Sequence, residues 1–406
     1  MSPKTKPPEL NSAQPKSAVL PYAWVILAVV YFASVAAPFN QFKVPPIMPE
    51  LITGFNIDLT QAGLLMSIIA VIGLVLALPA GILLQRYGPK LTGLVALACL
   101  AGGSAFGALS GSFGLLLAGR VIEGFGVGLI SVVAPAVIAM WFPPERQGGP
   151  MGIWATWVPV GTVVMYLAAP TLIISSGWQS VWWLGAAFAA VMFVVYAVLI
   201  RRPPNADATG SETPPLGPEL RKALANRNIW LLALMFACFN MVFVSQGSYY
   251  PTFLNTVREF SLGQAALIAS LGTIVVLASA PLAGWLSDKI GSRRLFFSLP
   301  FLVFAVLFLF PYTVTGVWIP ILMVLQGVFA GTVPTATFAT APEVMKRPQW
   351  AGFGLSAILI GQNIGQLLGP LLFGEAVKNL GWAGAGYLLI PICLVGFISG
   401  WMVKIR

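Results

Sequence analysis

The chain has 406 residues, of which 58% are hydrophobic and only 8% are charged, and its mean hydropathy is +0.88. A soluble domain carries roughly 25% charged residues, so this composition excludes a water-soluble globular protein. The lack of histidine excludes an imidazole base or metal ligand, and three scattered cysteines argue against a disulfide framework or a thiolate metal site. Because apolar helices of about 20 residues satisfy their own backbone in lipid, we expect an all-α integral membrane protein.

Twelve apolar segments follow a polar, proline-rich N-terminus, residues 1–20, which we expect to be disordered and cytoplasmic. Their extents are 22–44, 61–85, 91–109, 113–142, 151–174 and 181–200, then 229–254, 262–286, 295–314, 317–341, 351–377 and 383–403. A single long polar break, residues 201–227, separates the first six from the last six. Its proline-rich composition is typical of a linker, here cytoplasmic, between an N-terminal half (21–200) and a C-terminal half (228–406).

The basic residues are distributed unevenly between the two sides of the predicted bundle. With the N-terminus placed inside, 18 of the 22 lysines and arginines fall on the inner side. Arg258 and Lys378 fall outside, and Lys43 and Arg120 lie within segments. This bias predicts that both termini are cytoplasmic in a multi-pass protein of the plasma (inner) membrane. The net charge of +10 therefore reflects topology, and we expect a monomer surrounded by lipid, with no nucleic-acid partner.

A short glycine-containing turn occurs twice, half the chain apart. The stretch GILLQRYGPK begins at Gly81, and the stretch GWLSDKIGSRR begins at Gly284. Gly81 pairs with Gly284 and Gly88 pairs with Gly291, and each pair is 203 positions apart (284−81 and 291−88). Two six-helix halves that arose by duplication are the economical explanation.

This turn resembles the loop between helices 2 and 3 of the major facilitator superfamily, which reads G-x-L-x-D-R-x-G-R-[RK]. The second copy keeps the glycines and the aspartate of this pattern and ends in basic residues; its members are Gly284, Asp288, Gly291, Arg293 and Arg294. The first copy has Gly81, Arg86, Gly88 and Lys90, but Gln85 stands where the family has aspartate. The resemblance covers nearly the whole chain and implies twelve transmembrane helices in two pseudo-symmetric halves. It also implies that the turns form a cytoplasmic gate, with a weaker latch in the N-terminal half.

Two further stretches refine the resemblance. Arg120, Glu123 and Gly124 match the R-x-x-[QE]-G pattern of helix 4 in the family. The stretch MWFPPERQGGPMGIWATW, which begins at Met140, resembles the turn between helices 4 and 5 of organic-anion and cyanate-type porters. The resemblance therefore implies an anion porter in preference to a drug exporter.

Lys43, Arg120 and Glu123 lie within the predicted segments, where a charge costs several kcal/mol unless it is paired or hydrated. Lys43, near the outer end of segment 22–44, is either an interfacial lysine that reaches the headgroups or a substrate contact. Arg120 and Glu123 are one helical turn apart, so they form either a self-neutralised structural pair bonded to helix 1 or a site where Glu123 carries a proton. The three charges leave one positive charge in excess, which favours a small anion as substrate.

Neutral polar and aromatic side chains mark the helices that line the cavity in the family. Beside the three charges, the candidate substrate contacts are Asn40, Gln41, Trp154, Trp157, Asn240, Gln246, Tyr249, Gln326, Gln362 and Asn363. Gln362 and Gln366 share a helix face, as do Trp154 and Trp157, and a tryptophan pair is able to stack on a flat substrate. These residues have a second interpretation, because amides often join membrane helices and tryptophans often pack in a core.

We therefore expect a secondary transporter that carries a small organic or inorganic anion, such as a monocarboxylate or a cyanate-like species, by alternating access. No nucleotide-binding P-loop is present, so an ion or substrate gradient must drive transport, and a co-transported proton is one alternative. The lack of histidine, of a clustered carboxylate pair and of a soluble domain argues against an enzyme, and no cofactor or metal is expected. Export of apolar or cationic compounds and a non-transporting sensor are the competing hypotheses.

Overall fold

The computed structural model describes residues 20–77, 79–143, 146–201, 225–345 and 351–405, and the regular elements of these residues are helices. The expected disordered N-terminus, residues 1–19, lies outside the described residues, as does most of the expected linker, residues 202–224.

The N-terminal half begins with a broken first span. Helix α1 (Pro21–Gln41) leads through the 3₁₀ turn η1 (Pro45–Ile47) into α2 (Met48–Phe55). Pro45 and Pro46 prevent one continuous helix here, because proline cannot donate a backbone hydrogen bond. The other helices of this half are α3 (Leu59–Leu76), α4 (Pro79–Ala108), α5 (Phe113–Trp141), α6 (Gly148–Ala155), α7 (Trp157–Ser176) and α8 (Gln179–Leu199).

The C-terminal half begins with an unbroken first span, α10 (Arg227–Thr256). Its other helices are α11 (Leu262–Ile290), α12 (Arg293–Leu307), α13 (Trp318–Ala330), α14 (Thr332–Met345) and α15 (Ala351–Met402). Helices α13 and α14 meet at Gly331, shortly before Pro334, just as α6 and α7 meet at Thr156, shortly before Pro159. Both breaks therefore precede a proline that cannot bond to the preceding turn.

The number of membrane crossings follows from the helices and from two glycine turns. Ten helical stretches of the described residues are long and apolar enough to cross a bilayer. Helix α12 adds a crossing of 15 helical residues, and the 52 residues of α15 contain two crossings because Gly381 (φ 70°, ψ 176°) turns the chain. Helix α4 turns in the same way at Gly88 (φ 76°, ψ 166°), so residues 79–87 continue the span of α3. Glycine tolerates such a positive φ, and the twelve predicted crossings are present.

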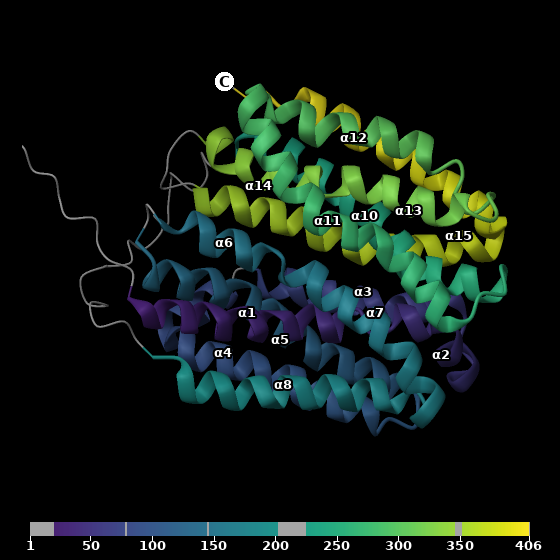
Figure 1. Ribbon diagram of the computed structural model, residues 1–406, viewed down its shortest axis with the longest axis horizontal. Coiled ribbons are helices and arrows are strands. Elements are labelled where there is room, and N and C mark those ends of the chain that lie inside the picture. The colour runs from purple at the N-terminus through teal and green to yellow at the C-terminus, as the bar shows by residue number, and fades with distance from the viewer. Residues whose placement is uncertain (1–19, 78, 144–145, 202–224, 346–350, 406) are drawn as a thin grey trace, which may run out of the picture.

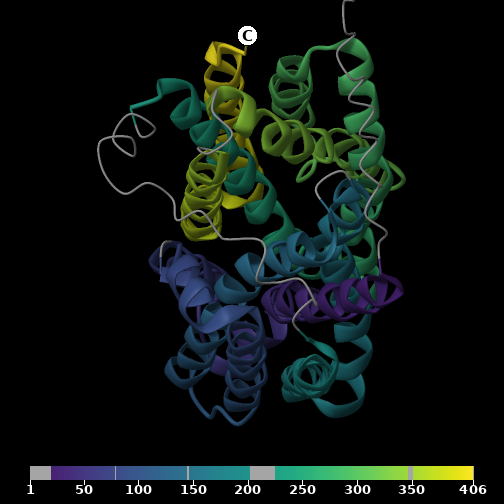
Figure 2. The same cartoon turned by 90° about the vertical axis from the view of Figure 1, so that its left-hand side faces the viewer.

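The two six-helix halves lie side by side along the long axis of the molecule (Figure 1). The start of α1, the end of α8, the start of α10 and the end of α15 gather at one end, which we call the linker end; α2 lies at the opposite end. Figure 2, which views the molecule from the linker end, shows the N-terminal half below the C-terminal half.

The contacts between the halves are not spread evenly along the molecule. Helix α15 packs on α3, and α11 packs on α7. The hydrogen bonds and the ion pair that join described residues of the two halves lie between the middle of the bundle and the opposite end. They are Gln41 to Gln366, Thr60 to Glu375, Tyr166 to the Gly247 carbonyl, Tyr249 to the Leu59 carbonyl, and Lys378 to Asp58. The described residues therefore close the molecule at the opposite end and not at the linker end.

The halves repeat one another at the level of single contacts. A Cβ atom added to Gly124 of α5 would lie 2.9 Å from Cβ of Ile72 in α3. A Cβ atom added to Gly327 of α13 would lie 2.8 Å from Cβ of Val275 in α11. Both equivalent pairs, 124 with 327 and 72 with 275, have the 203-residue spacing of the repeated turn. The halves are therefore pseudo-symmetric, and this spacing identifies equivalent positions in their first, second and fourth spans.

Glycine also allows α4 and α5 to approach each other closely. A Cβ atom added to Gly103 would lie 2.8 Å from the backbone nitrogen of Glu123 and 2.8 Å from the carbonyl oxygen of Gly119. Small residues at such contacts are typical of paired membrane helices. The position of Glu123 therefore depends on the lack of a side chain at Gly103.

We predict that Gly103→Ala lowers the melting temperature of the detergent-purified protein, because the added methyl group forces α4 and α5 apart at a cost of about 1–3 kcal/mol. The matched control is Gly102→Ala, one residue earlier, where an added Cβ meets no atom within 4 Å. Alanine should keep or slightly raise stability there, since glycine weakens a helix by roughly 0.5–1 kcal/mol. Equal melting temperatures for the two variants would contradict the packing.

Candidate functional site

The break in the first span leaves backbone carbonyls that need hydrogen-bond donors, because the last carbonyls of a helix have no intrahelical partner. Those of Asn40 and Gln41 accept hydrogen bonds from Nη1 and Nη2 of Arg120 in α5, each at 2.7 Å. Nε of Arg120 donates to the carbonyl of Leu65 in α3 at 2.9 Å. A cation at a helix C-terminus is also favoured by the helix dipole. Arg120 therefore fixes the end of α1 against α3 and α5.

Glu123 lies between two cations. Its Oε2 accepts a hydrogen bond from Nη1 of Arg120 at 2.7 Å, and its Oε1 lies 2.5 Å from Nζ of Lys43. All three side chains are 0% exposed. Lys43 therefore points inward and does not reach the membrane surface. Arg120 and Glu123 form an ion pair that is bonded to the end of α1, which is one of the two expected alternatives. We call these three residues the charge cluster.

Lys43 has further partners within the N-terminal half. Its Nζ donates to Oγ of Ser104 in α4 at 2.7 Å and to Oδ1 of Asn40 at 3.3 Å. It also lies 4.6 Å from the ring centre of Trp182 in α8, whose carbonyl accepts a hydrogen bond from Ser104 at 2.7 Å. The charge cluster thus ties together the first, second, third, fourth and sixth spans. Two cations and one carboxylate give it a formal charge of +1, and charges persist in a low-dielectric interior only when they are paired and hydrogen-bonded.

The C-terminal half has neutral side chains at the equivalent positions. The residues 203 positions after the three members of the charge cluster are Gln246, Met323 and Gln326. They also meet in space, since Nε2 of Gln246 donates to Oε1 of Gln326 at 2.8 Å and lies 3.7 Å from Sδ of Met323. Nε2 of Gln326 is buried and has no hydrogen-bond partner among the described residues. We call this group the neutral counterpart.

A path of amide side chains connects the charge cluster to the C-terminal half. Gln41, whose carbonyl accepts from Arg120, donates through Nε2 to Oε1 of Gln366 in α15 at 3.2 Å. Gln366 donates to Oδ1 of Asn240 in α10 at 3.4 Å. This amide path crosses the interface of the halves where the first span breaks.

Two tryptophans at the break between α6 and α7 stack on each other. The ring centroids of Trp154 and Trp157 are 5.5 Å apart, and the planes differ by 13°. Nε1 of Trp154 donates to Oγ of Ser34 in α1 at 3.0 Å, and Oγ1 of Thr156 lies 2.9 Å from the hydroxyl of Tyr31. Both indoles are half-buried, so the pair packs on α1 and keeps part of its surface free.

The remaining candidate residues lie apart from the charge cluster. Asn363 is half-buried and packs against Gly73 of α3, and Gln362 beside it is also half-buried. The Tyr249 hydroxyl lies 2.7 Å from the carbonyl oxygen of Leu59, at the opposite end. A cavity of about 40 Å³ at the linker end and a groove of about 480 Å³ between α10 and α15 contain none of the candidate substrate contacts. The structure thus places these candidates in separate groups.

Four residues that contact these groups were not predicted from the sequence. Ser104 and Trp182 contact Lys43, and Ser34 and Tyr31 bond to Trp154 and Thr156. They lie on strongly apolar helices, where a single hydroxyl or indole gives no periodic signal. The sequence did contain a signal for the neutral counterpart. The 203-residue spacing of the repeated turn aligns the charge cluster with Gln246, Met323 and Gln326.

The two copies of the repeated turn lie at the linker end and differ in their pairing. In the second copy, Arg293 pairs with Asp288 at 3.5 Å and with Glu343 of α14 at 2.8 Å. Next to it, Arg294 lies 4.2 Å from the ring centre of Trp401. In the first copy, the guanidinium of Arg86 lies 5.4 Å from the ring centre of the neighbouring tyrosine, and Lys90 pairs with no described carboxylate. Among the described residues, no hydrogen bond or ion pair joins either turn to the other half.

We predict that Glu123→Gln destabilises the protein by about 3–5 kcal/mol, because it leaves two buried cations without a counter-charge. Lys43→Gln should cost much less, since Arg120 and Glu123 remain a neutral pair and glutamine is the residue at the equivalent position of the other half. The loss of stability is measured by thermal unfolding in detergent. A thiol-reactive dye follows the unfolding, because it reports when the buried Cys238 and Cys393 become exposed. If both variants were equally unstable, Glu123 would not be the shared counter-charge.

Comparisons with known proteins agree with this architecture. The sequence profile of the Major Facilitator Superfamily matches residues 30–344 and 259–406. The phosphoglycerate transporter protein of Salmonella typhimurium is 26% identical over 388 residues, which cover 86% of this chain and 82% of that relative. The hexuronate transporter of Bacillus subtilis is 23% identical over 264 residues, which cover 63% of this chain and 60% of that relative.

A solved structure shows the same fold. A bacterial homologue of the human lysosomal transporter Spinster, in an inward-facing and unoccupied conformation, superposes with a TM-score of 0.76. It is 18% identical in sequence, and the match covers 94% of this chain and 93% of that chain. The profile match, the duplicated halves and the twelve crossings lead to one conclusion. The chain belongs to the Major Facilitator Superfamily, as a multi-pass membrane transporter and not an enzyme.

Proposed function

We propose that this transporter carries a small organic or inorganic anion by alternating access, in which the two halves rock about a site near the middle of the bundle. The observation that carries the proposal is the excess positive charge of the charge cluster at the break of the first span. The equivalent positions of the other half, Gln246, Met323 and Gln326, carry no charge.

The neutral counterpart indicates that the fold does not require charge at these positions. Burying an ion in a membrane costs several kcal/mol unless it is paired, and the C-terminal half fills the same place with a glutamine pair bonded at 2.8 Å. Arg120 and Glu123 neutralise each other while they hold the end of α1. Lys43 then provides the positive charge that no second carboxylate balances, and we propose that this charge attracts the anion.

Lys43 acts on the anion at a distance in this conformation, because it is completely buried. A unit charge 8 Å away contributes about 2 kcal/mol at an effective dielectric constant of about 20. The direct contacts are the N–H groups along the interface of the halves, which we assign to Gln41, Trp154, Trp157, Asn240, Gln362, Asn363 and Gln366. An anion that enters between Gln41 and Gln366 replaces their mutual hydrogen bond, so binding and separation of the halves are coupled.

The linker end is, in this proposal, the cytoplasmic side of the plasma membrane, and a single chain is the transporting unit. Supporting this orientation, the sequence pattern assigns 18 of the 22 basic residues to the inner side of the predicted bundle. The conformation is then open to the cytoplasm and closed outside, where Tyr249 helps to join the halves. The repeated turns would close the inner side, and Gln85 makes the first copy the weaker of the two.

A co-transported proton is assigned to Glu123, which is the one fully buried carboxylate among the described residues. Two cations hold Glu123 here, so a proton binds only after one cation has moved away. Proton binding would therefore accompany the change of conformation, and comparing uptake with and without an imposed proton gradient tests this assignment.

We predict that Lys43→Gln reduces anion uptake into proteoliposomes roughly ten-fold or more, because about 1.4 kcal/mol of lost attraction is a factor of ten. Suitable probes are phosphoglycerate and hexuronate, the compounds named for the two relatives. The matched control is Lys404→Gln, which removes the same charge from an exposed side chain near the C-terminus.

Normal uptake by a correctly inserted Lys43→Gln protein would overturn the charge argument. Flux of cations or apolar compounds with no anion uptake by the wild-type protein would select an exporter instead. Binding of an anion without flux would select a sensor.

A further inference from the structure

The second copy of the repeated turn is neutralised by two carboxylates. Arg293 at the start of α12 pairs with Asp288 at the end of α11 and with Glu343 in α14, at 3.5 and 2.8 Å. Its Nη1 also donates to the carbonyl of Ala339 in α14. The protein therefore supplies the whole set of acceptors for this cation.

The first copy lacks both carboxylates. The residues 203 positions before Asp288, Arg293 and Glu343 are Gln85, Lys90 and Met140. Lys90 is exposed and pairs with no carboxylate of the described residues. The N-terminal half thus retains the cation of the pseudo-symmetric site and has an amide and a thioether in place of its anions.

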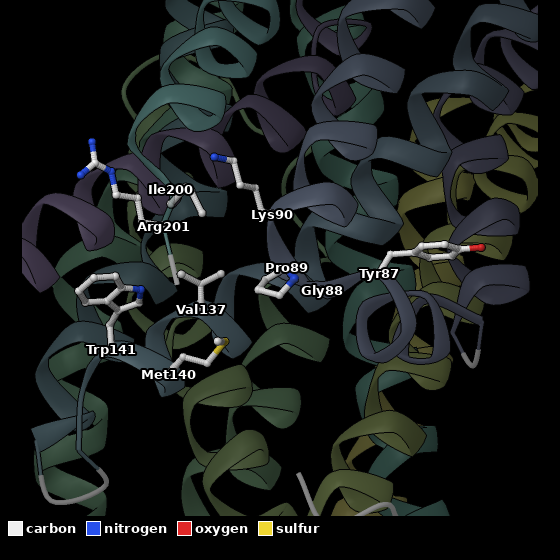
Figure 3. Close-up of a pocket in the computed structure, with 9 residues that line it drawn as sticks. All are labelled: Tyr87, Gly88, Pro89, Lys90, Val137, Met140, Trp141, Ile200 and Arg201. Carbon is white, nitrogen blue, oxygen red and sulfur yellow. The ribbon is translucent and has the colours of Figure 1, made fainter. Parts of the chain in front are cut away.

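A cavity lies beside this unpaired lysine (Figure 3). It has a volume of about 40 Å³, and its lining includes Lys90, Val137, Met140, Trp141 and Arg201. Figure 3 shows Lys90 and Arg201 along one side, with Val137, Met140 and Trp141 along the other. A water molecule needs roughly 10–15 Å³ of such space, so the cavity fits one compact oxyanion group and not a whole metabolite.

The backbone adds to the positive character of the cavity. Gly88, at φ 76°, turns the chain so that a new helical segment starts at Pro89, and both residues line the cavity. The first N–H groups of a helix have no intrahelical acceptor, and they favour an anion. Arg201 is held from the other side, with its guanidinium 5.8 Å from the ring centre of Tyr22. Lys90, Arg201 and a helix N-terminus therefore line a cavity whose lining contains no described carboxylate.

We propose that this cavity binds the phosphate group of an anionic ligand, which takes the place of the carboxylates that Arg293 has in the other half. Lys90 and Arg201 supply the positive charge that attracts the phosphate group. Met140 stands where the other half has a glutamate, so no carboxylate occupies this position of the cavity. A phosphate group can reach this site as the headgroup of an acidic phospholipid or as a free ion. Basic pockets between membrane helices on the cytoplasmic side are typical sites of acidic lipid headgroups. The site lies outside the substrate contacts, so it does not depend on the transported compound.

The test uses the full-length protein in phosphatidylcholine nanodiscs and measures its melting temperature in two arms. One arm replaces part of the phosphatidylcholine with phosphatidylglycerol, and the other adds inorganic phosphate. We expect an upward shift of about 2 °C or more in at least one arm, since a ligand stabilises the folded state by mass action. Met140→Glu, which installs the carboxylate of the other half, should abolish the shift, as should Lys90→Gln.

The control is Lys289→Gln, which removes another exposed lysine at the linker end that does not line the cavity. It should keep the full shift. A shift with phosphatidylglycerol alone identifies a lipid headgroup, and a shift with inorganic phosphate identifies a soluble anion. The proposal fails if neither arm shifts the wild-type protein, or if Lys90→Gln and Met140→Glu respond as strongly as Lys289→Gln.

Discussion

The structure depends on the electrostatic balance of Lys43, Arg120 and Glu123 in a bilayer interior. The prolines after α1 break the first span, and the break leaves carbonyls without donors. Arg120 supplies the donors and brings a charge with it, and Glu123 neutralises that charge from the next turn of α5. Lys43 then shares the same carboxylate, so one anion serves two cations. This sharing makes the first span dependent on the position of α5, and it leaves the positive charge on which the proposed anion transport relies.

The duplicated halves distribute their charges in opposite ways. The N-terminal half has charges in the middle of the membrane, where the C-terminal half has Gln246 and Gln326. At the linker end the order is reversed, because Arg293 has two carboxylate partners and the equivalent Lys90 has none among the described residues. The N-terminal half thus has its paired charges in the middle of the bundle, and the C-terminal half has them at the linker end. Such a division suits a transporter in which a single site must be reached from two sides by the movement of two similar bodies.

Most of the fold could be predicted from the sequence, because bilayer thickness and the backbone's need for hydrogen bonds fix the length and type of each crossing. Helix α2 was missed, because the predicted first segment, 22–44, ends just before Pro45 and Pro46, and no helix was expected over residues 48–55. The pairing of Arg120 with Glu123 followed from their spacing on one helix face. The inward direction of Lys43 did not follow, because it depends on Ser104 and Trp182, which lie more than 60 residues away in sequence. Contacts of that kind arise from helix packing and have no local pattern.

Movement of the halves in opposite senses at the two ends is the central claim, and pulsed electron spin resonance distances test it most directly. After replacement of the three cysteines, spin labels at the exposed equivalent positions Tyr87 and Ile290 report on the linker end. Labels at the exposed positions Thr53 and Thr256 report on the opposite end. A transported anion should produce a second population in which the 87 to 290 distance is shorter and the 53 to 256 distance is longer. Alternating access by this chain would be contradicted if the 87 to 290 and 53 to 256 distances lengthened together. It would also be contradicted if no anion changed either distance.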